Sequence, residues 1–230
     1  MKRERGTLNK KSWKEVVGRA AANLFYERGY LETSMDDIAA AAKLSKGGIY
    51  HYFSNKNEIL FFISSDCMDL ILKDLEEELK KIEDNSLRIQ YIISRHLGLY
   101  IKYMAEAKTL FFEKHLLSPK YLRIIAGKER KYLQILVNVL SEFFKGKLPR
   151  DTLNVIAFSL FGMCNNIYHW YNPRGRITPE ELAEIIHILF YEGVKGYSKG
   201  MDKPASIRFG ATQIGRWRTT PKYPVTRDPI

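Results

Sequence analysis

The amino-acid sequence predicts an all-α protein of about nine helices, and three observations support this fold class. Apolar residues recur every three to four positions in almost every segment, which is the period of an amphipathic helix. No segment shows the strict alternation of apolar and polar residues that is typical of a half-buried strand. Short clusters of Gly, Pro, Asn and Asp separate the periodic segments, as is typical of connections between packed helices. A chain of 230 residues can bury a core in one or two domains.

The boundaries of the predicted helices follow from capping and helix-breaking residues. The segments with helical period cover residues 12–28, 35–42, 46–52, 55–82, 86–104, 106–117, 120–145, 151–171 and 178–199. Gly29 supplies the C-terminal stop of the first segment. Ser34, followed by Asp37 three positions later, resembles a capping box for the second segment, and Ser45 is a suitable N-cap for the third. Because the second and third segments are short and joined by a tight turn, they predict a helix-turn-helix.

The later segments are longer and predict a second helical region. Residues 55–82 form one uninterrupted run, which as a single helix would span roughly 40 Å. Gly146 and Pro149 separate the seventh segment from the eighth. Thr178 is a suitable N-cap for the last helix, because Pro179 follows at the first helical position and two acidic residues occupy the first turn.

The formal net charge of +11 is concentrated at the two ends of the chain. Residues 1–60 hold eleven Lys and Arg against seven Asp and Glu, and residues 201–230 hold six against two. The first fourteen residues resemble a basic arm, with one acid, Glu4, among the cations Lys2, Arg3, Arg5, Lys10, Lys11 and Lys14. This distribution favours a polyanionic partner such as nucleic acid.

The cysteine count and the hydropathy pattern limit the class of protein. Cys67 and Cys164 form neither a disulfide framework nor the spacing of a metal site. The first apolar stretch is short and interrupted by charge, unlike a signal peptide. No stretch approaches the roughly 20 apolar residues that a membrane span needs. We therefore expect a cytoplasmic protein with no membrane partner, no metal and no cofactor.

The third predicted helix carries the most informative motif. Gly47 and Gly48 lie in its first turn, although glycine costs about 1 kcal/mol relative to alanine in a helix. Their missing side chains favour close approach of the helix N-terminus to a phosphate, and a frayed helix start is the alternative. Hydroxyl and basic side chains beside them are common phosphate partners, and a histidine can also reach a base edge. Ile49 and Phe53 lie four residues apart and are expected to pack inward.

The run from Thr33 to Leu60 resembles the DNA-binding domain of TetR-family repressors, and the match covers about residues 12–60. Its most specific part is Ser45-Lys46-Gly47-Gly48-Ile49-Tyr50-His51-Tyr52-Phe53, followed by Lys56 and Glu58. The residues expected to contact operator DNA are Ser34, Ser45, Lys46, Gly47, Gly48, Tyr50, His51, Tyr52 and Lys56. Gly48 departs from the family pattern, in which a hydroxyl residue is common at this place.

The resemblance implies a DNA-binding domain at residues 1–54, a ligand-binding and dimerisation domain at 55–200, and a basic tail at 201–230 of unassigned role. The last two predicted helices are so apolar that an interface between two copies of the chain is expected, with an ordinary core as the alternative. The residues expected in this homodimer interface are Phe161, Tyr168, Leu182, Ile186, Leu189, Phe190, Gly193, Val194 and Tyr197.

Polar and aromatic residues inside the apolar helices are candidates for an effector pocket, since a buried polar group needs a partner. The candidate ligand-binding residues are Tyr100, Tyr103, Met104, Phe111, Phe112, His115, Asn165, Asn166 and His169. Each could instead be a core residue with its hydrogen bonds satisfied within the protein.

The segment from Tyr168 to Leu182 resembles the regulatory domain of the TetR branch that controls fatty-acid degradation and binds acyl-CoA. That resemblance implies a long-chain acyl-CoA as the small hydrophobic effector, which would release the protein from double-stranded operator DNA. Basic residues would hold the phosphates of the CoA end, and the candidates are Arg88, Arg95, Arg123, Lys128, Arg130 and Lys131. A solvated basic face is the alternative interpretation of these residues.

Three other classes of function are weaker. An enzyme is disfavoured, because the sequence has no paired histidine spacing, no nucleophile elbow, no Gly-rich phosphate loop and therefore no candidate catalytic residue. A helical adaptor or nucleoid protein would bind DNA without responding to a ligand. A repressor for a drug-like hydrophobic cation would need carboxylates in its pocket. Acidic residues are sparse among the apolar central helices, where Glu106 and Glu113 are the exceptions, so this class ranks below acyl-CoA.

Overall fold

The computed structural model describes residues 10–201, and within this range it contains ten α-helices, two short 3-10 helices and no strand. This confirms the all-α fold class. The α-helices are α1 (Lys10–Arg28), α2 (Met35–Ala41), α3 (Lys46–Tyr50), α4 (Lys56–Leu72), α5 (Leu75–Lys80), α6 (Asn85–Lys102), α7 (Met104–Glu113), α8 (Pro119–Phe143), α9 (Arg150–Asn165) and α10 (Pro179–Met201). The 3-10 helices are η1 (Lys114–Leu116) and η2 (Ile167–His169). Most of the expected basic arm and nearly all of the tail lie outside the described residues.

The single helix expected over residues 55–82 is wrong, because α4 ends at Leu72 and α5 begins after a break. Asp74 has a φ of 55° in the left-handed region, which interrupts the helical hydrogen bonds. Arg95, from α6, stabilises the exposed end of α4 by donating hydrogen bonds of 2.6–3.0 Å to backbone carbonyls. The acceptors are the carbonyl oxygens of Leu70, Ile71 and Lys73. The remaining helix, α4, is roughly 25 Å long.

Two other predicted helices end early. The helix expected over residues 151–171 stops at Asn165 and is followed by η2, and the helix expected over 106–117 stops at Glu113 and is followed by η1. In both cases a 3-10 turn continues the helical path, which is common at helix C-termini.

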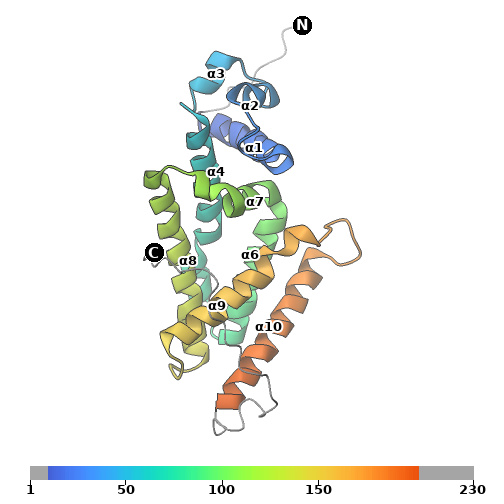
Figure 1. The fold of residues 1–230 in the computed structure, drawn as a ribbon. Helices are drawn as coiled ribbons and strands as arrows, with labels where there is room; N and C mark the ends of the chain where they lie inside the picture. The colour runs from blue at the N-terminus through green and yellow to red at the C-terminus, as the bar shows by residue number, and fades with distance from the viewer. Residues whose placement is uncertain (1–9, 202–230) are drawn as a thin grey trace, which may run out of the picture. The chain divides into compact units, whose positions relative to one another are not determined.

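The N-terminal core holds α1, α2 and α3 against the beginning of α4 (Figure 1). Ile49 of α3 and Phe53 are 0% and 1% exposed, which confirms their expected core roles. From this group α4 leads away and packs against α7 and α8, and α7 also packs against α1. The same helix therefore belongs to the core beneath α3 and to the helical layers behind it.

A second core lies among α6, α8 and α9, which pack on one another. The chain divides into two compact units, residues 1–191 and 192–230, and the boundary falls within α10. None of the helices between residues 10 and 201 is long and apolar enough to cross a membrane. Over the same residues, no group of three or more His, Cys, Asp and Glu side chains could hold a metal ion.

Candidate functional site

The helices α2 and α3 are fixed by the caps that the sequence predicts. Ser34 and Asp37 form a full capping box, in which the Ser34 hydroxyl accepts from the Asp37 N–H at 3.1 Å and the Asp37 carboxylate accepts from the Ser34 N–H at 2.9 Å. Hydrogen bonds from Ser34 also lower the pKa of Asp37. Ser45 caps α3 by accepting from the Gly48 N–H at 3.1 Å. Lys43, with a φ of 56°, closes the turn between the two helices. The hydroxyl groups of Ser34 and Ser45 are thus already occupied as the N-caps of α2 and α3.

The two glycines of α3 have different surroundings. Neither has a φ in the left-handed region, so the backbone conformation does not demand glycine at either position. A Cβ on Gly48 would lie 3.2 Å from the Ser45 hydroxyl oxygen, which is a tight contact with the cap. A Cβ on Gly47 would meet no heavy atom within 4 Å. The fold therefore leaves open space at Gly47, as expected if a partner approaches the backbone there.

The polar side chains around α3 are exposed and make few or weak contacts within the protein. Lys46 pairs with Asp36 at 3.0 Å, and both side chains are mostly in solvent, where such a pair contributes little stability. Tyr50 is 47% exposed and His51 is also exposed. Tyr52 is half-buried, and its ring stacks with Trp13 of α1 at a centroid distance of 6.3 Å. Lys46, Tyr50 and His51 can therefore reach a ligand without breaking the fold.

Lys56 has a different position from the one expected of a phosphate contact. Its ammonium donates to the backbone carbonyls of Tyr30 at 2.6 Å, Leu31 at 3.2 Å and Thr33 at 2.6 Å, and lies 4.3 Å from the centroid of the Tyr30 ring. Burial lowers the pKa of Lys56, and the charge of Glu32 partly offsets this. An ammonium has three N–H donors, and all three are occupied. The structure therefore favours a clamp on the α1–α2 loop over a direct phosphate hydrogen bond.

The centre of the regulatory half contains a polar cluster of four residues, which we call the His96 cluster: His96, Tyr100, Tyr132 and Asn165. His96 Nε2 lies 2.9 Å from Asn165 Oδ1, and His96 Nδ1 lies 3.1 Å from the Tyr132 hydroxyl. The Tyr100 hydroxyl donates to the Asn165 carbonyl at 3.1 Å. Because Asn165 Oδ1 only accepts, Nε2 carries the proton of a neutral imidazole. Burial lowers the pKa of His96 to about 4 and raises the pKa of Tyr132.

The nine candidate ligand-binding residues do not line one pocket. Tyr100 and Asn165 belong to the buried His96 cluster, together with His96 and Tyr132, which the sequence analysis missed. Their polar atoms on otherwise apolar helix faces are the signal that could have found them. The other candidates are exposed or partly exposed: Tyr103, Met104, Phe111, Phe112, His115, Asn166 and His169. Phe112 packs edge-on against Tyr168 with the ring centroids 5.0 Å apart.

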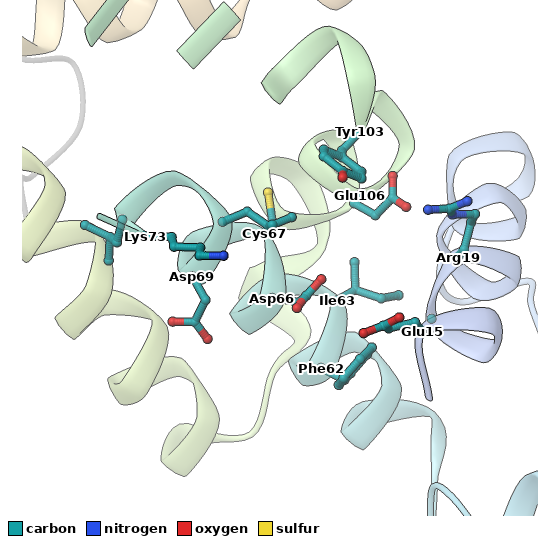
Figure 2. A pocket seen from close by; sticks show the side chains of 13 residues that line it. Glu15, Arg19, Phe62, Ile63, Asp66, Cys67, Asp69, Lys73, Tyr103 and Glu106 are labelled. Atoms are coloured by element: carbon teal, nitrogen blue, oxygen red, sulfur yellow. The ribbon is translucent and has the colours of Figure 1, made fainter. Parts of the chain in front are cut away.

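A cleft of about 610 Å³ opens between α1, α4 and the start of α7 (Figure 2). Among the candidate ligand-binding residues, its lining includes Tyr103 alone. Four carboxylates line it, those of Glu15, Asp66, Asp69 and Glu106, against the cations Arg19 and Lys73. Figure 2 shows Arg19 of α1 pointing toward Glu106 of α7. Cys67 also lines the cleft, and burial and the nearby carboxylates raise its thiol pKa to about 12, so this thiol is inert at neutral pH.

Two parts of the chain match known domain families. Residues 19–61 match the family of bacterial regulatory proteins named tetR, and residues 83–194 match the tetracyclin repressor-like C-terminal domain. A TetR/AcrR-family transcriptional regulator from Thermobifida fusca is 30% identical with a TM-score of 0.60, and the match covers 80% of this chain and 98% of that one. This chain belongs to the TetR family. It is therefore a ligand-responsive transcription regulator and not an enzyme.

Two further relatives are similar to the chain over different lengths. The structure of AibR in complex with isovaleryl coenzyme A and operator DNA is 29% identical with a TM-score of 0.68, and the match covers 77% of this chain and 98% of that one. The fatty acid metabolism regulator protein of Bacillus subtilis is 31% identical over 80 residues. That alignment covers 35% of this chain and less than half, 41%, of the Bacillus protein.

TetR-family regulators typically act as dimers, and the exposed apolar residues of this TetR regulator show which helix faces are open to a partner. Four expected interface residues of α10 are instead buried in the described chain: Leu182, Ile186, Phe190 and Val194. The exposed large apolar side chains of this helix within the first unit are Ile185, Ile188 and Leu189, and on α9 they are Val155 and Phe158. Leu189 and Tyr197 are thus the exposed large side chains among the expected α10 set, and Phe161 lies half-buried beside Tyr132. The exposed large apolar residues of α10 therefore differ from most of the expected set, and the homodimer interface itself stays a prediction.

Proposed function

We propose that the chain is a repressor that binds operator DNA as a dimer and leaves it when an acyl-CoA binds. The observation that carries the DNA-binding part is the exposed surface of α3, where Gly47 leaves open space and Lys46, Tyr50 and His51 are exposed with at most weak partners. The second helix of a helix-turn-helix enters the major groove by its N-terminal end. In this proposal residues 1–54 bind DNA, and residues 55–200 bind the ligand and the partner copy.

The proposed DNA contacts follow from exposure. Lys46, Tyr50 and His51 reach phosphates or base edges, and the backbone at Gly47 approaches a phosphate. Ser34, Ser45, Gly48 and Tyr52 hold this surface in shape and lie at its margin. Lys56 supports the surface through the α1–α2 loop. The dimer would use the exposed faces of α9 and α10.

The acyl-CoA part of the proposal has two supports. The related AibR structure contains isovaleryl coenzyme A with operator DNA, and the Bacillus relative is named a fatty acid metabolism regulator. Four of the six basic candidates are occupied by contacts within the protein: Arg88, Arg95, Lys128 and Lys131. Arg123 and Arg130 are exposed on one face of α8, seven residues apart, and are the better placed to hold CoA phosphates.

The energy needed for release is within the reach of an acyl chain. A hundredfold drop in operator affinity corresponds to a coupling free energy of about 2.7 kcal/mol. Burial of several CH₂ groups at about 0.8 kcal/mol each exceeds this value if one conformation of the protein has the better-formed site. The chain would enter among α6, α8 and α9, where the rings around His96 are stacked.

A second effector class is favoured by the cleft between α1, α4 and α7. Its four carboxylates face the cations Arg19 and Lys73, and Asp69 is also paired with Lys128 at 2.6 Å, so an excess of one negative charge disfavours CoA phosphates and favours a hydrophobic cation. Phe62, Ile63 and Tyr103 supply apolar surface for such a ligand. A cation in this cleft would bind between α1, α4 and the start of α7.

One thermal-shift screen separates the two classes, since a ligand that binds only the folded state raises its stability by mass action. The probes are palmitoyl-CoA, isovaleryl-CoA, free palmitate and a cationic dye such as ethidium. Stabilisation by an acyl-CoA and not by ethidium supports the proposal, and loss of that stabilisation in Arg123→Ala/Arg130→Ala assigns the phosphate site. Stabilisation by ethidium alone, lost in Glu106→Gln, would replace acyl-CoA by a cation. Fluorescence anisotropy with a duplex selected from a random library then shows whether the same ligand releases DNA.

A further inference from the structure

The first turn of α4 touches both functional parts of the molecule through two consecutive side chains. Lys56 binds the carbonyls of the α1–α2 loop, directly before the helix-turn-helix. Asn57 binds the junction between η1 and α8: its Nδ2 donates to the Leu116 carbonyl at 2.8 Å, and its Oδ1 accepts from the Ser118 N–H at 3.1 Å. The side-chain amide of Asn57 thus joins α4 to Leu116 and Ser118, which lie 59 and 61 positions later in the chain.

Asn57 also lies next to the residue that holds the DNA-binding side. The ammonium of Lys56, its neighbour in the chain, donates to the Tyr30 carbonyl at 2.6 Å and lies 4.3 Å from the centroid of the Tyr30 ring. Tyr30 lies in the loop between α1 and α2. The first turn of α4 therefore joins the loop that leads into α2 and α3 to the backbone from which α8 begins.

Further along, α4 and α8 are held together at two more levels. One turn beyond Asn57, the rings of Phe61 and Tyr121 stack with centroids 4.1 Å apart and an interplanar angle of 10°. One to two turns further, the Lys128 ammonium donates to the Ser65 hydroxyl at 2.7 Å and to Asp69 at 2.6 Å. The start of α8 and the start of α4 are therefore expected to move together. Of these contacts, the two hydrogen bonds of Asn57 are the ones that start from the turn of α4 in which Lys56 holds the α1–α2 loop. Phe61 and Tyr121 also pack against the N-terminal core.

We infer that Asn57 is a positioning residue that transmits a displacement of the η1–α8 junction to the DNA-reading helix. When a ligand shifts the start of α8, the two hydrogen bonds of Asn57 pull the first turn of α4 and the Tyr30 loop with it, which changes the position of α3. This inference rests on the proposed function, since it supposes an effector that lowers operator affinity. An asparagine suits this role because one side chain presents a donor and an acceptor to adjacent backbone groups.

The chain offers a matched control two residues earlier. Asn55 caps α4 by accepting from the Glu58 N–H at 2.9 Å, and among the described residues its side chain makes no hydrogen bond to the η1–α8 junction. Removing an N-cap typically costs about 1 kcal/mol. Asn55→Ala thus weakens the same helix without cutting the connection. Asn57→Ala removes both hydrogen bonds, and Asn57→Asp keeps the acceptor for Ser118 while losing the donor to Leu116.

The first arm of the test needs no effector. Hydrogen exchange is measured on the full chain with and without an operator duplex selected from a random library, because exchange reports local opening. In wild type and in Asn55→Ala, operator should change deuterium uptake both in peptides covering residues 34–52 and in peptides covering 114–126. In Asn57→Ala the first change should persist and the second should vanish. A change in 114–126 that survives in both Asn57 variants would overturn the inference.

The second arm measures operator affinity with and without palmitoyl-CoA or isovaleryl-CoA. Wild type and Asn55→Ala should lose about 100-fold in affinity on addition of the active acyl-CoA, Asn57→Ala less than about fivefold, and Asn57→Asp an intermediate amount. An undiminished 100-fold loss in Asn57→Ala would also overturn the inference. If wild type itself responds to neither acyl-CoA, the proposed effector fails, and the exchange arm alone decides the role of Asn57. If Asn57→Ala does not fold, Asn57→Asp is judged by the same criteria.

Discussion

The DNA-reading surface, which is the exposed side of α3, and the regulatory core among α6, α8 and α9 use polar side chains in opposite ways. Around α3, Lys46, Tyr50 and His51 are exposed and have at most weak partners. In the regulatory core, His96 and Tyr132 are buried and their polar atoms are joined to one another and to Asn165. The first arrangement can bind a partner without any change of fold. In the second, internal hydrogen bonds already occupy the polar atoms, so a ligand could use them only by exchanging those bonds.

The two regions therefore differ in the free energy of exchanging a polar partner. A polar atom at the surface is hydrated before it binds, so a DNA contact replaces water at modest net gain. A buried polar atom that loses its partner incurs a desolvation penalty of about 1–3 kcal/mol. An effector that enters the regulatory core must therefore satisfy the His96 cluster or leave it intact. Under the proposed function, this requirement would link binding of the effector to a change of conformation in this region.

The largest effect is expected at a buried position of α10. Phe190→Asp should lower the free energy of unfolding by about 4 kcal/mol or more, because an unpaired charge would replace a side chain that is 6% exposed. Urea unfolding followed by circular dichroism measures this. Leu189→Asp changes the neighbouring residue, which is 62% exposed, and should leave the protomer within about 0.5 kcal/mol at a protein concentration where it is monomeric.

The same pair tests the dimer face. Sedimentation velocity should show that Leu189→Asp shifts wild-type dimers toward monomers while the protomer stays folded. A wild-type chain that is monomeric at micromolar concentration, or a Leu189→Asp variant that remains fully dimeric, would show that the exposed face of α10 is not the interface.

The next largest effect concerns pH and the buried imidazole. The pKa of His96 is lowered to about 4, so the unfolded chain binds a proton between pH 6.5 and 4 that the folded chain does not. Stability from this group is therefore complete above pH 6.5 and falls as the pH decreases, by about 3 kcal/mol at pH 4. His96→Gln keeps a donor and an acceptor but does not titrate in this range. The difference in unfolding free energy between wild type and His96→Gln should shrink from pH 7 to pH 4, and a constant difference would contradict a neutral buried His96.

Local signals in the sequence were sufficient for the DNA-reading end. The capping box of Ser34 and Asp37 and the cap at Ser45 are present as predicted, because a cap depends on residues three positions apart. The N-cap of the last helix is also confirmed by the hydrogen bond from the Glu181 N–H to the Thr178 hydroxyl at 3.1 Å. The inward packing of Ile49 and Phe53 follows from helical spacing alone.

The regulatory half was less predictable, because its details depend on contacts between distant residues. The break at Asp74 is stabilised by Arg95, more than twenty positions away, so the periodicity of residues 55–82 gave no sign of it. Asn165 is bound to His96, which lies 69 positions earlier. On α10 apolar residues occupy much of the circumference, and periodicity does not tell which face the protomer itself covers. These three differences explain why the helix break, the partner of Asn165 and the buried face of α10 could not be predicted from the sequence.

Lys56 and Lys46 are a matched pair of cations with different roles. Lys56→Ala should lower the free energy of unfolding by about 2 kcal/mol, because three carbonyls lose a charged donor. It should leave the slope of log affinity against log salt unchanged. Lys46→Ala should leave stability nearly unchanged, since its ion pair is exposed, and should reduce that slope by about one. Salt titrations of DNA binding and urea unfolding of both variants measure this, and the reverse pattern would assign the phosphate contact to Lys56.

The smallest change in stability is expected at Gly47, where stability and operator affinity should change in opposite directions. Gly47→Ala should raise the free energy of unfolding by up to about 1 kcal/mol, because alanine favours the helix and its Cβ meets no heavy atom within 4 Å. The same methyl group should weaken operator binding by about tenfold, because it keeps the helix backbone from a phosphate and costs roughly one hydrogen bond. A more stable protein that binds DNA less tightly is not expected from a frayed helix start. Thermal unfolding and fluorescence anisotropy measure the two quantities.

Gly48→Ala is the control for that prediction, since it adds the same methyl group one residue later. There the Cβ would lie 3.2 Å from the Ser45 hydroxyl that caps α3, so the gain in helix propensity should be reduced or reversed. Any loss of DNA binding at Gly48 should therefore accompany a loss of stability, whereas at Gly47 the two should change in opposite directions. If Gly47→Ala binds operator as tightly as wild type, the open space at this position does not mark the contact with phosphate, and the DNA-binding role would fall to the side chains of Lys46, Tyr50 and His51 alone.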